Sequence, residues 1–226
     1  PMQSLLGTIP KENIIGEPVG RDTAPCIAMA AALVSAKSTS KDPVMGIFPA
    51  DHVIRDSKSF CNVINDSISA SEKGNIVTIG VKPASPSTAY GYIHFGKKID
   101  FKCGTSFHEG LGFREKPDLE TAKKFLADGN YSWNSGMFIW KVSTIIEAFR
   151  KHSPELAAAS DSIRKSVNGG NLMETIEGEY LKVKKISIDY AVMEKASNVV
   201  VAECLFDWDD VGSWTALRNQ SSPLGD

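Results

Sequence analysis

Short aliphatic runs alternate with segments of helical periodicity along the first third of the sequence. Residues 13–15, 44–48 and 76–81 are strand-like, whereas residues 24–37 and 60–68 repeat apolar side chains at helical spacing. Strands that alternate with helices along a chain lie in one sheet with helices on its faces. The pattern therefore predicts an α/β fold with a Rossmann-like, mostly parallel sheet flanked by helices.

The rest of the chain continues as a mixture of strands and helices. Extended segments joined by a polar turn are expected at residues 91–96 and 110–117. Further strands are expected at residues 136–140, 199–201 and 204–206, and further helices at residues 118–127, 143–152, 154–167 and 187–194. Since no repeat, low-complexity tract or linker divides the sequence, we expect a single domain spanning residues 1–226.

Charge and composition exclude several classes of function. The chain has 226 residues, a formal net charge of -2 and a pI near 6.1, and it lacks the basic block with which proteins bind nucleic acid. No apolar run approaches the roughly 20 residues of a membrane span, and the first residues lack the features of a signal peptide. The four cysteines are scattered, so we expect free thiols. We therefore expect a cytoplasmic protein that binds neither nucleic acid nor membrane.

An acidic residue, Asp51, directly follows an expected buried strand. The run 44–48 ends in the segment FPADH, so this carboxylate stands at the carboxyl end of the strand, where ligands of open α/β sheets bind. A carboxylate there can hold Mg²⁺ against a phosphate, and Asp210 follows another apolar stretch. His52, beside Asp51, is the histidine best placed for a functional role. The competing interpretation is that Asp51 caps the following turn.

Segments spread along almost the whole sequence carry a resemblance to a known family. They are EPVGRDTAP (17–25), FPADH (48–52), FREKP (113–117), WNSGMF (133–138), IDYAVMEK (188–195) and WDDVGSW (208–214). Taken in this order, they resemble bacterial mannose-1-phosphate guanylyltransferases. The order of the whole set is far more specific than any single segment. The resemblance implies a fold of the nucleotide-diphospho-sugar transferase type.

The resemblance also implies a reaction, the transfer of a nucleotide from GTP to mannose 1-phosphate with Mg²⁺, which forms GDP-mannose and pyrophosphate. A phosphate oxygen of the sugar attacks the α-phosphorus of GTP without a covalent enzyme intermediate. The protein then has to align two phosphates and screen their charge. The alternatives are an inactive fragment that binds sugar phosphate or nucleotide, and a nucleotidyltransferase for another sugar phosphate.

The implied metal ligands are Asp51 in FPADH and Asp210 in WDDVGSW. Asp209 is adjacent, but neighbouring residues of an extended segment point to opposite sides, so only one of the two is expected to reach the metal. Its position in the motif favours Asp210. Lys116 completes the implied catalytic set as the cation that neutralises the sugar phosphate.

The implied nucleotide-binding residues are Glu17, Arg21, Thr23, Ala24 and Asp51. We also expect Thr23 to cap the helix at residues 24–37, whose first amides suit an anionic or carbonyl ligand. A helix cap alone is the competing interpretation. The family usually has Asn at the position of Asp22, so this chain adds a charge there.

The implied sugar-binding residues are Gly91, Tyr92, Glu115, Lys116, Asn134, Gly136, Asp189, Tyr190 and Glu194. Each group also has a simpler interpretation. Gly91 and Tyr92 fit a turn glycine and a core aromatic, and Asn134 fits a turn at the entry of a strand. The Glu115 and Lys116 side chains fit a solvated surface pair.

The family begins with a strand, a GGxGxRLWPxSR loop and a PKQ segment, which this sequence does not contain. It also lacks the family's C-terminal extension after DVGSW. The resemblance therefore implies an N-terminally incomplete domain, which we expect to make no GDP-mannose alone. A piece of a longer enzyme, an inactive product and a fragment completed by another chain all stay open, as does a homo-oligomer.

Overall fold

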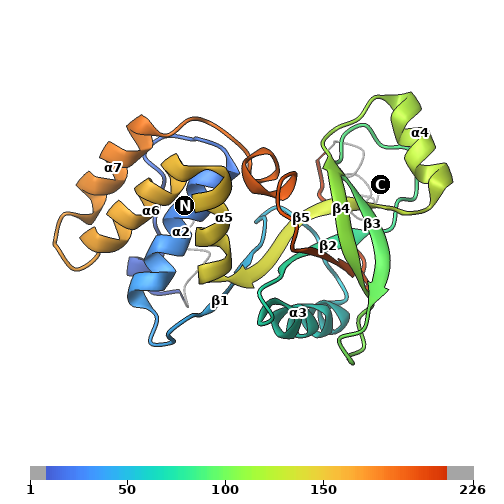
Figure 1. The fold of residues 1–226 in the computed structure, drawn as a ribbon, viewed down its shortest axis with the longest axis horizontal. Helices are drawn as coiled ribbons and strands as arrows, with labels where there is room; N and C mark the ends of the chain where they lie inside the picture. Colours follow the sequence, from blue (N-terminus) through green and yellow to red (C-terminus); the bar gives the residue numbers. More distant parts are fainter. Residues whose placement is uncertain (1–8, 213–226) are drawn as a thin grey trace, which may run out of the picture.

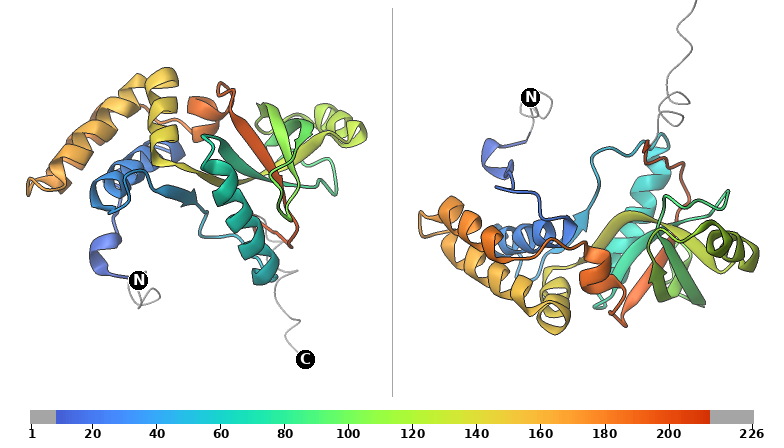
Figure 2. Two further views of the ribbon diagram at one scale, coloured as in Figure 1. Left: turned by 60° about the horizontal axis from the view of Figure 1, so that its bottom comes forward. Right: turned by 90° about the horizontal axis from the view of Figure 1, so that it is seen from above.

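The computed structural model describes residues 9–212. Its helices are α2 (Thr23–Lys37), α3 (Ser57–Ser71), α4 (Leu119–Asp128), α5 (Val142–His152), α6 (Pro154–Ser166) and α7 (Leu172–Lys182), with the short helices η1 (Lys11–Asn13) and η2 (Asp189–Met193). Its strands are β1 (Val44–Ile47), β2 (Ile76–Val81), β3 (Tyr92–Ile99), β4 (Phe107–Arg114), β5 (Tyr131–Lys141) and β6 (Val199–Glu203). Figures 1 and 2 show α2, α5, α6 and α7 grouped at one end of an elongated molecule and β3, β4 and α4 at the other.

The described strands form one sheet, in the order β1-β5-β2-β6-β4-β3, and β3 also pairs with the start of β5. The expected α/β fold with helices flanking the sheet is confirmed. The strand directions differ from the expectation, because β2 and β6 are parallel whereas the other pairings within residues 9–212 are antiparallel. The prediction of a mostly parallel sheet is therefore wrong.

Strand β5 is the reason for this difference. β1 and β2 run in the same direction, as expected for strands joined through a helix, but β5 lies between them and is antiparallel to both. The local alternation of strands and helices predicts the direction of consecutive strands. It does not predict which later strand will be inserted between them.

Most predicted elements are present, and a few are not. β2 has the predicted bounds, and α4, α5 and α6 begin at or next to their predicted starts. Residues 13–15 form no strand, because they have no strand partner among residues 9–212, and Asn13 is instead the last residue of η1. Residues 204–206 also lie outside a strand, and α7 has no counterpart among the predicted elements.

The start of α2 differs from the prediction in its capping residue. Asp22 is the N-cap, and its Oδ1 accepts a hydrogen bond from the Thr23 amide at 2.8 Å. Thr23 Oγ1 instead accepts a hydrogen bond from the Ile188 amide at 2.8 Å. The prediction that Thr23 caps α2 is therefore wrong, and its hydroxyl joins α2 to the segment that leads into η2.

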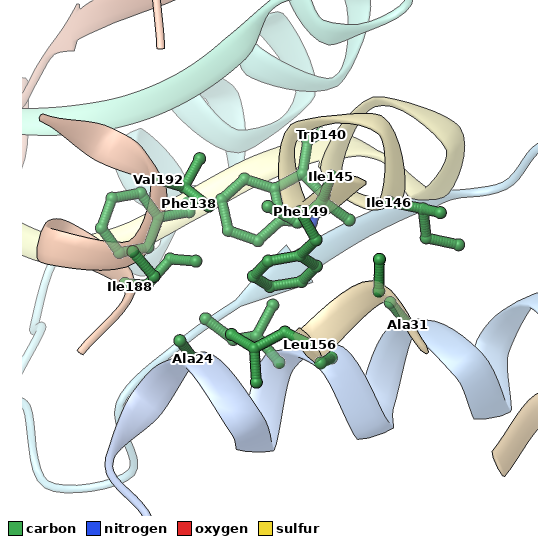
Figure 3. Packing of buried hydrophobic residues seen from close by; sticks show 14 of the residues in the cluster. Ala24, Ala31, Phe138, Trp140, Ile145, Ile146, Phe149, Leu156, Ile188 and Val192 are labelled. Atoms are coloured by element: carbon green, nitrogen blue, oxygen red, sulfur yellow. The ribbon is translucent and has the colours of Figure 1, made fainter. Parts of the chain in front are cut away.

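Strand β5 is covered by apolar side chains on both faces. Phe138 and Trp140 belong to a core formed with α2, α5 and α6, whereas Met137 and Ile139 belong to a second core beneath α3. Successive side chains of a strand point to opposite faces, so a strand between two cores has a continuous apolar run. Figure 3 shows the first core, in which Phe149 lies among Trp140, Leu156 and the small side chains of α2.

Two expectations from composition concern the chain as a whole. Cys26, Cys61, Cys103 and Cys204 are free thiols, as their spacing predicted. Within residues 9–212, no helix has both the length and the apolar character needed to cross a membrane.

The first core provides a test of the fold. Phe149 is 0% exposed, and we predict that Phe149→Ala lowers the free energy of unfolding by about 3 to 5 kcal/mol, because it removes buried apolar area and leaves a cavity. Leu181→Ala is the control, because Leu181 is 75% exposed and its loss should change stability by less than about 0.5 kcal/mol. Urea unfolding followed by tryptophan fluorescence measures both, and equal midpoints for the two variants would contradict this packing.

Candidate active site

Two acidic segments that are far apart in the sequence lie side by side. The Val53 amide donates to the Asp209 carbonyl at 2.8 Å, and the Asp209 amide donates to the Val53 carbonyl at 3.2 Å. Asp207 adds to this contact by accepting hydrogen bonds from the amides of Arg55 and Asp56. The loop after β1 is therefore fastened to the chain that follows β6.

This contact brings together Asp51, His52 and Asp210. His52 Nδ1 accepts a hydrogen bond from Trp208 Nε1 at 3.1 Å, and burial lowers the pKa of His52 although both carboxylates act in the opposite direction. Asp210 Oδ1 accepts from the Tyr90 hydroxyl at 2.9 Å and from the Gly212 amide at 3.2 Å. The described residues 9–212 hold no group of three or more His, Cys, Asp or Glu side chains arranged around a metal.

The structure distinguishes the adjacent aspartates of the WDDVGSW segment. Asp209 Oδ1 accepts a hydrogen bond from the Val211 amide at 2.8 Å, within its own turn. The Asp210 carboxylate reaches across to Tyr90 instead. The two neighbouring carboxylates therefore have different partners, and the predicted choice of Asp210 as the metal ligand stays a prediction. Residues 213 and 214 of the segment lie outside the described residues.

Asn134 is the centre of a second polar group. Its backbone amide donates to the Gly91 carbonyl at 2.8 Å, and its side-chain Nδ2 donates to Asp189 Oδ1 at 2.9 Å. Its Oδ1 accepts from the Gly136 amide at 3.1 Å. A methyl group added at Gly91 would lie 2.5 Å from Glu115 Oε2, so the Glu115 carboxylate lies directly against this backbone. Residues predicted to bind sugar are therefore brought together from four segments of the chain.

Close contacts join this polar group to the acidic pair. Gly136 has a φ of +71°, and a methyl group there would lie 3.6 Å from Pro49 in the segment that carries Asp51. Tyr90, which contacts Asp210, directly precedes Gly91. The two polar groups are therefore adjacent in the fold.

Some predicted sugar-binding residues have other surroundings. The Tyr92 side chain is 0% exposed, and its hydroxyl donates to the Ser87 carbonyl at 3.0 Å, which favours the interpretation of a core aromatic. Tyr190 is half-exposed, and Glu194 is exposed but close enough to Asp189 to help raise its pKa. Lys116 pairs with Glu115 at 3.2 Å.

The predicted nucleotide-binding residues are only partly connected to this site. Thr23 reaches it, because the Ile188 amide that it binds precedes Asp189. The Ala24 amide already donates to the Ile186 carbonyl at 3.2 Å, so it is not available to a ligand. Arg21 Nε donates to the Tyr180 carbonyl at 3.1 Å, and Glu17 lies close enough to Tyr180 to help raise the pKa of its phenol. These contacts place Glu17 and Arg21 next to Tyr180 of α7, and none of the contacts involves Asp51 or Asp210.

Sequence reasoning did not identify Tyr90 and Trp208, which hold the acidic segments. Trp208 belongs to the WDDVGSW segment, and Tyr90 precedes a predicted sugar-binding glycine, so both were adjacent to recognised residues. Burial and the contact with Asp210 raise the pKa of Tyr90 to about 12, so its hydroxyl stays protonated at neutral pH. The contact between the Tyr90 and Trp208 rings is evident only in the folded structure.

An apolar cavity lies elsewhere, beside α2. It has a volume of about 490 Å³ and a mostly apolar lining that includes Ile15, Met29 and Leu33. Such a lining offers few groups that bind phosphate or sugar hydroxyls. We therefore place the candidate site at the converging polar groups and not at this cavity.

Fold and sequence together place the chain in a class of transferases. The chain belongs to the nucleotidyl transferase family, whose model matches residues 2–225.

Individual relatives narrow this class. The mannose-1-phosphate guanylyltransferase of Escherichia coli (strain K12) is 39% identical over 207 residues, and the match covers 91% of this chain and 43% of the relative. The xanthan biosynthesis protein XanB of Xanthomonas campestris pv. campestris (strain B100) is 41% identical over 224 residues, covering 97% of this chain and 45% of the relative. The resemblance to mannose-1-phosphate guanylyltransferases is confirmed. The chain spans less than half the length of these relatives.

Solved structures confirm the fold class. The crystal structure of mannose-1-phosphate geranyltransferase from Thermus thermophilus matches with a TM-score of 0.80 and 35% identity, covering 92% of this chain and 58% of that one. The crystal structure of mannose-6-phosphate isomerase from Helicobacter pylori matches with a TM-score of 0.74 and 26% identity, covering 92% and 78%.

The surroundings of Asp189 predict a dependence of stability on pH. Burial, with Glu115 nearby, raises the pKa of Asp189 from 3.8 to about 6. A raised pKa means that the native state binds this proton more tightly than the unfolded state, so its stabilising effect is full below pH 3.8 and is lost as the pH rises to about 6. We predict that Asp189→Asn, which keeps an acceptor for Asn134, is more stable than the wild type by about 1 to 3 kcal/mol at pH 7. This gain should disappear near pH 4.

Urea unfolding at a series of pH values measures this difference. Asp128→Asn is the matched control, because Asp128 also accepts a hydrogen bond from an asparagine amide, at 2.9 Å, but on the exposed surface. Its effect should change much less with pH. A difference between Asp189→Asn and the wild type that is constant from pH 4 to pH 7 would contradict the prediction.

Proposed function

We propose that this chain carries the metal-binding and sugar-binding groups of an enzyme that transfers a nucleotide from GTP to mannose 1-phosphate. The products are GDP-mannose and pyrophosphate. The proposal depends on one observation, that the bridge between Val53 and Asp209 brings the segments of Asp51 and Asp210 together, so that both carboxylates act on His52. The name of the relative from Escherichia coli, mannose-1-phosphate guanylyltransferase, supports the choice of substrates.

Asp51 and Asp210 fit a site for Mg²⁺ by their chemistry. This ion is usually held by one or two carboxylates, with waters and substrate phosphates as the other ligands. Two carboxylates, those of Asp51 and Asp210, are a donor set that suits such a site. Mg²⁺, when bound there, would supply the positive charge that screens the phosphates.

The remaining residues would bind and orient the sugar phosphate. Glu115 and Asp189 would accept hydrogen bonds from its hydroxyls, while Asn134 holds Asp189 in place. Lys116 would neutralise its phosphate, so that a phosphate oxygen can approach the α-phosphorus of GTP and displace pyrophosphate. Such alignment of reactants lowers the barrier without any covalent bond to the protein.

The local backbone supports a functional role for Glu115 and Lys116. Lys116 is a non-glycine residue with a φ of +42°, in the sparsely populated left-handed region. Such a conformation costs about 1 to 3 kcal/mol and persists where the surrounding structure requires it, often at functional sites. The Glu115 side chain is 25% exposed and lies against Gly91, unlike a fully solvated surface pair.

A second candidate function is a module that binds sugar phosphate without transferring a nucleotide. The contacts of Glu17 and Arg21 with Tyr180 favour it, because these predicted nucleotide-binding residues are not directed to the acidic pair. Pyrophosphate release by the natural gene product, with GTP, Mg²⁺ and mannose 1-phosphate, separates the candidates. Turnover supports the transferase, and binding without turnover supports the module.

The sugar site predicts a specific loss of affinity. We expect Glu115→Gln to weaken the binding of mannose 1-phosphate about tenfold or more, because hydrogen bonds to a charged acceptor contribute about 1.5 to 3 kcal/mol. Glu120→Gln is the matched control, because Glu120 also pairs with a lysine, Lys123 at 2.9 Å, on the surface of α4. Calorimetry measures both affinities, and equal effects of the two substitutions would place the sugar elsewhere.

A further inference from the structure

The side chain of Tyr90 packs between two tryptophan rings, next to Asp210. Its ring lies 4.8 Å from the Trp133 ring and 5.5 Å from the Trp208 ring, measured between centroids, with an interplanar angle of 64° in each case. Such edge-to-face contacts orient a ring as well as bury it. Tyr90 precedes β3 and Trp208 follows β6, so the fold holds this ring from separate elements.

This placement directs the Tyr90 hydroxyl at one oxygen of Asp210. The hydroxyl donates to Asp210 Oδ1 at 2.9 Å, and the same oxygen accepts from the Gly212 amide at 3.2 Å. Among the described residues, Asp210 Oδ2 accepts no hydrogen bond. One oxygen of the carboxylate is thus held by two hydrogen bonds, whereas the other has no such partner within residues 9–212.

His52, which follows Asp51 in the sequence, is held by Trp208, one of the two tryptophans that pack against Tyr90. Trp208 Nε1 donates to His52 Nδ1 at 3.1 Å, and the two rings are 5.3 Å apart at an angle of 87°. Trp208 therefore contacts both Tyr90, which binds Asp210, and His52, which follows Asp51. The aromatic side chains of Tyr90 and Trp208 thus connect the two acidic segments.

We propose that Tyr90 is a positioning residue for the metal site: its hydroxyl holds Oδ1 of Asp210 and leaves Oδ2 for a divalent cation shared with Asp51. This inference rests on the proposed function, which assigns the cation to these two carboxylates. Outer hydrogen bonds that orient a ligand typically change metal affinity by 10- to 100-fold when they are removed. Tyr90 acts through Asp210 and does not itself contact the cation.

The alternative is that Tyr90 only fills space between the two tryptophans. Phenylalanine would fill this space equally well, so Tyr90→Phe separates the two roles. Tyr131→Phe is the matched control, because Tyr131 also stacks on an aromatic ring, that of Phe125 at 4.0 Å, and lies away from Asp210.

Mn²⁺ is the probe, since electron paramagnetic resonance of the free ion gives its affinity for the protein without any enzymatic turnover. We expect Tyr90→Phe to weaken Mn²⁺ binding about tenfold or more, and Tyr131→Phe to leave it unchanged. In the Asp210→Asn background, Tyr90→Phe should have no further effect, because the residue through which it acts has been changed.

The outcomes separate this inference from the proposed function. Wild-type affinity in Asp210→Asn, or no Mn²⁺ binding by the wild type, would overturn the metal assignment and the inference with it. Weak binding by Asp210→Asn combined with wild-type affinity in Tyr90→Phe would overturn the role of Tyr90 alone. A Tyr90→Phe variant that unfolds at lower urea concentration but binds Mn²⁺ as the wild type does would show a purely structural role.

Discussion

The pairing of β5 with three other strands is the constraint on which the architecture depends. β5 pairs with β1 through residues 138–141 and with β2 through residues between 133 and 139, and its first residues, 131–133, pair with β3. The register between β2 and β5 shifts at one point. Thr78 pairs with Phe138 and Gly80 pairs with Asn134, so an advance of two residues along β2 corresponds to four residues along β5. Irregularities of this kind redirect side chains and occur next to active sites. Here the irregularity carries Gly136 and presents Asn134 to Gly91 and Asp189.

The acidic half of the site depends on a much smaller contact. Asp51 and Asp210 both lie outside the strands, so the sheet alone does not determine their separation. The hydrogen bonds between Val53 and Asp209 do, with the aromatic group around Trp208 packed beside them. Such a site combines a strand of the central sheet, β5, with loops that are held by a few hydrogen bonds. Residues that bind ligands commonly lie on loops positioned by a scaffold in this way.

Local signals in the sequence were sufficient for much of the fold. Three elements illustrate this: β2 has an aliphatic run, α6 begins with Pro154, and α4 is capped by Asp118. Each signal acts through residues that are close together in the chain. Residues 13–15 have the same aliphatic character as β2, but they lack a partner strand in the described structure. A strand requires a partner, and the partner cannot be identified from the run itself.

The candidate site was predictable only through the order of the motifs. Nothing near Asp51 in the sequence indicates that Asp210 lies beside it, because the contact depends on the path of the whole sheet. Tyr92 was predicted to bind sugar just as Asn134 was, yet the pleat of β3 turns its side chain into the core. Tyr90, two residues earlier and not predicted, is the tyrosine whose side chain reaches Asp210. Motifs thus locate the segments of a site, while strand register determines which side chain faces it.

A crystal structure of the protein with mannose 1-phosphate and Mn²⁺ tests most directly whether these segments form one site. The account predicts an anomalous peak for Mn²⁺ between the carboxylates of Asp51 and Asp210, and the sugar against Asn134 and Glu115. Mn²⁺ held by other side chains, or the sugar seated in the apolar cavity beside α2, would contradict it.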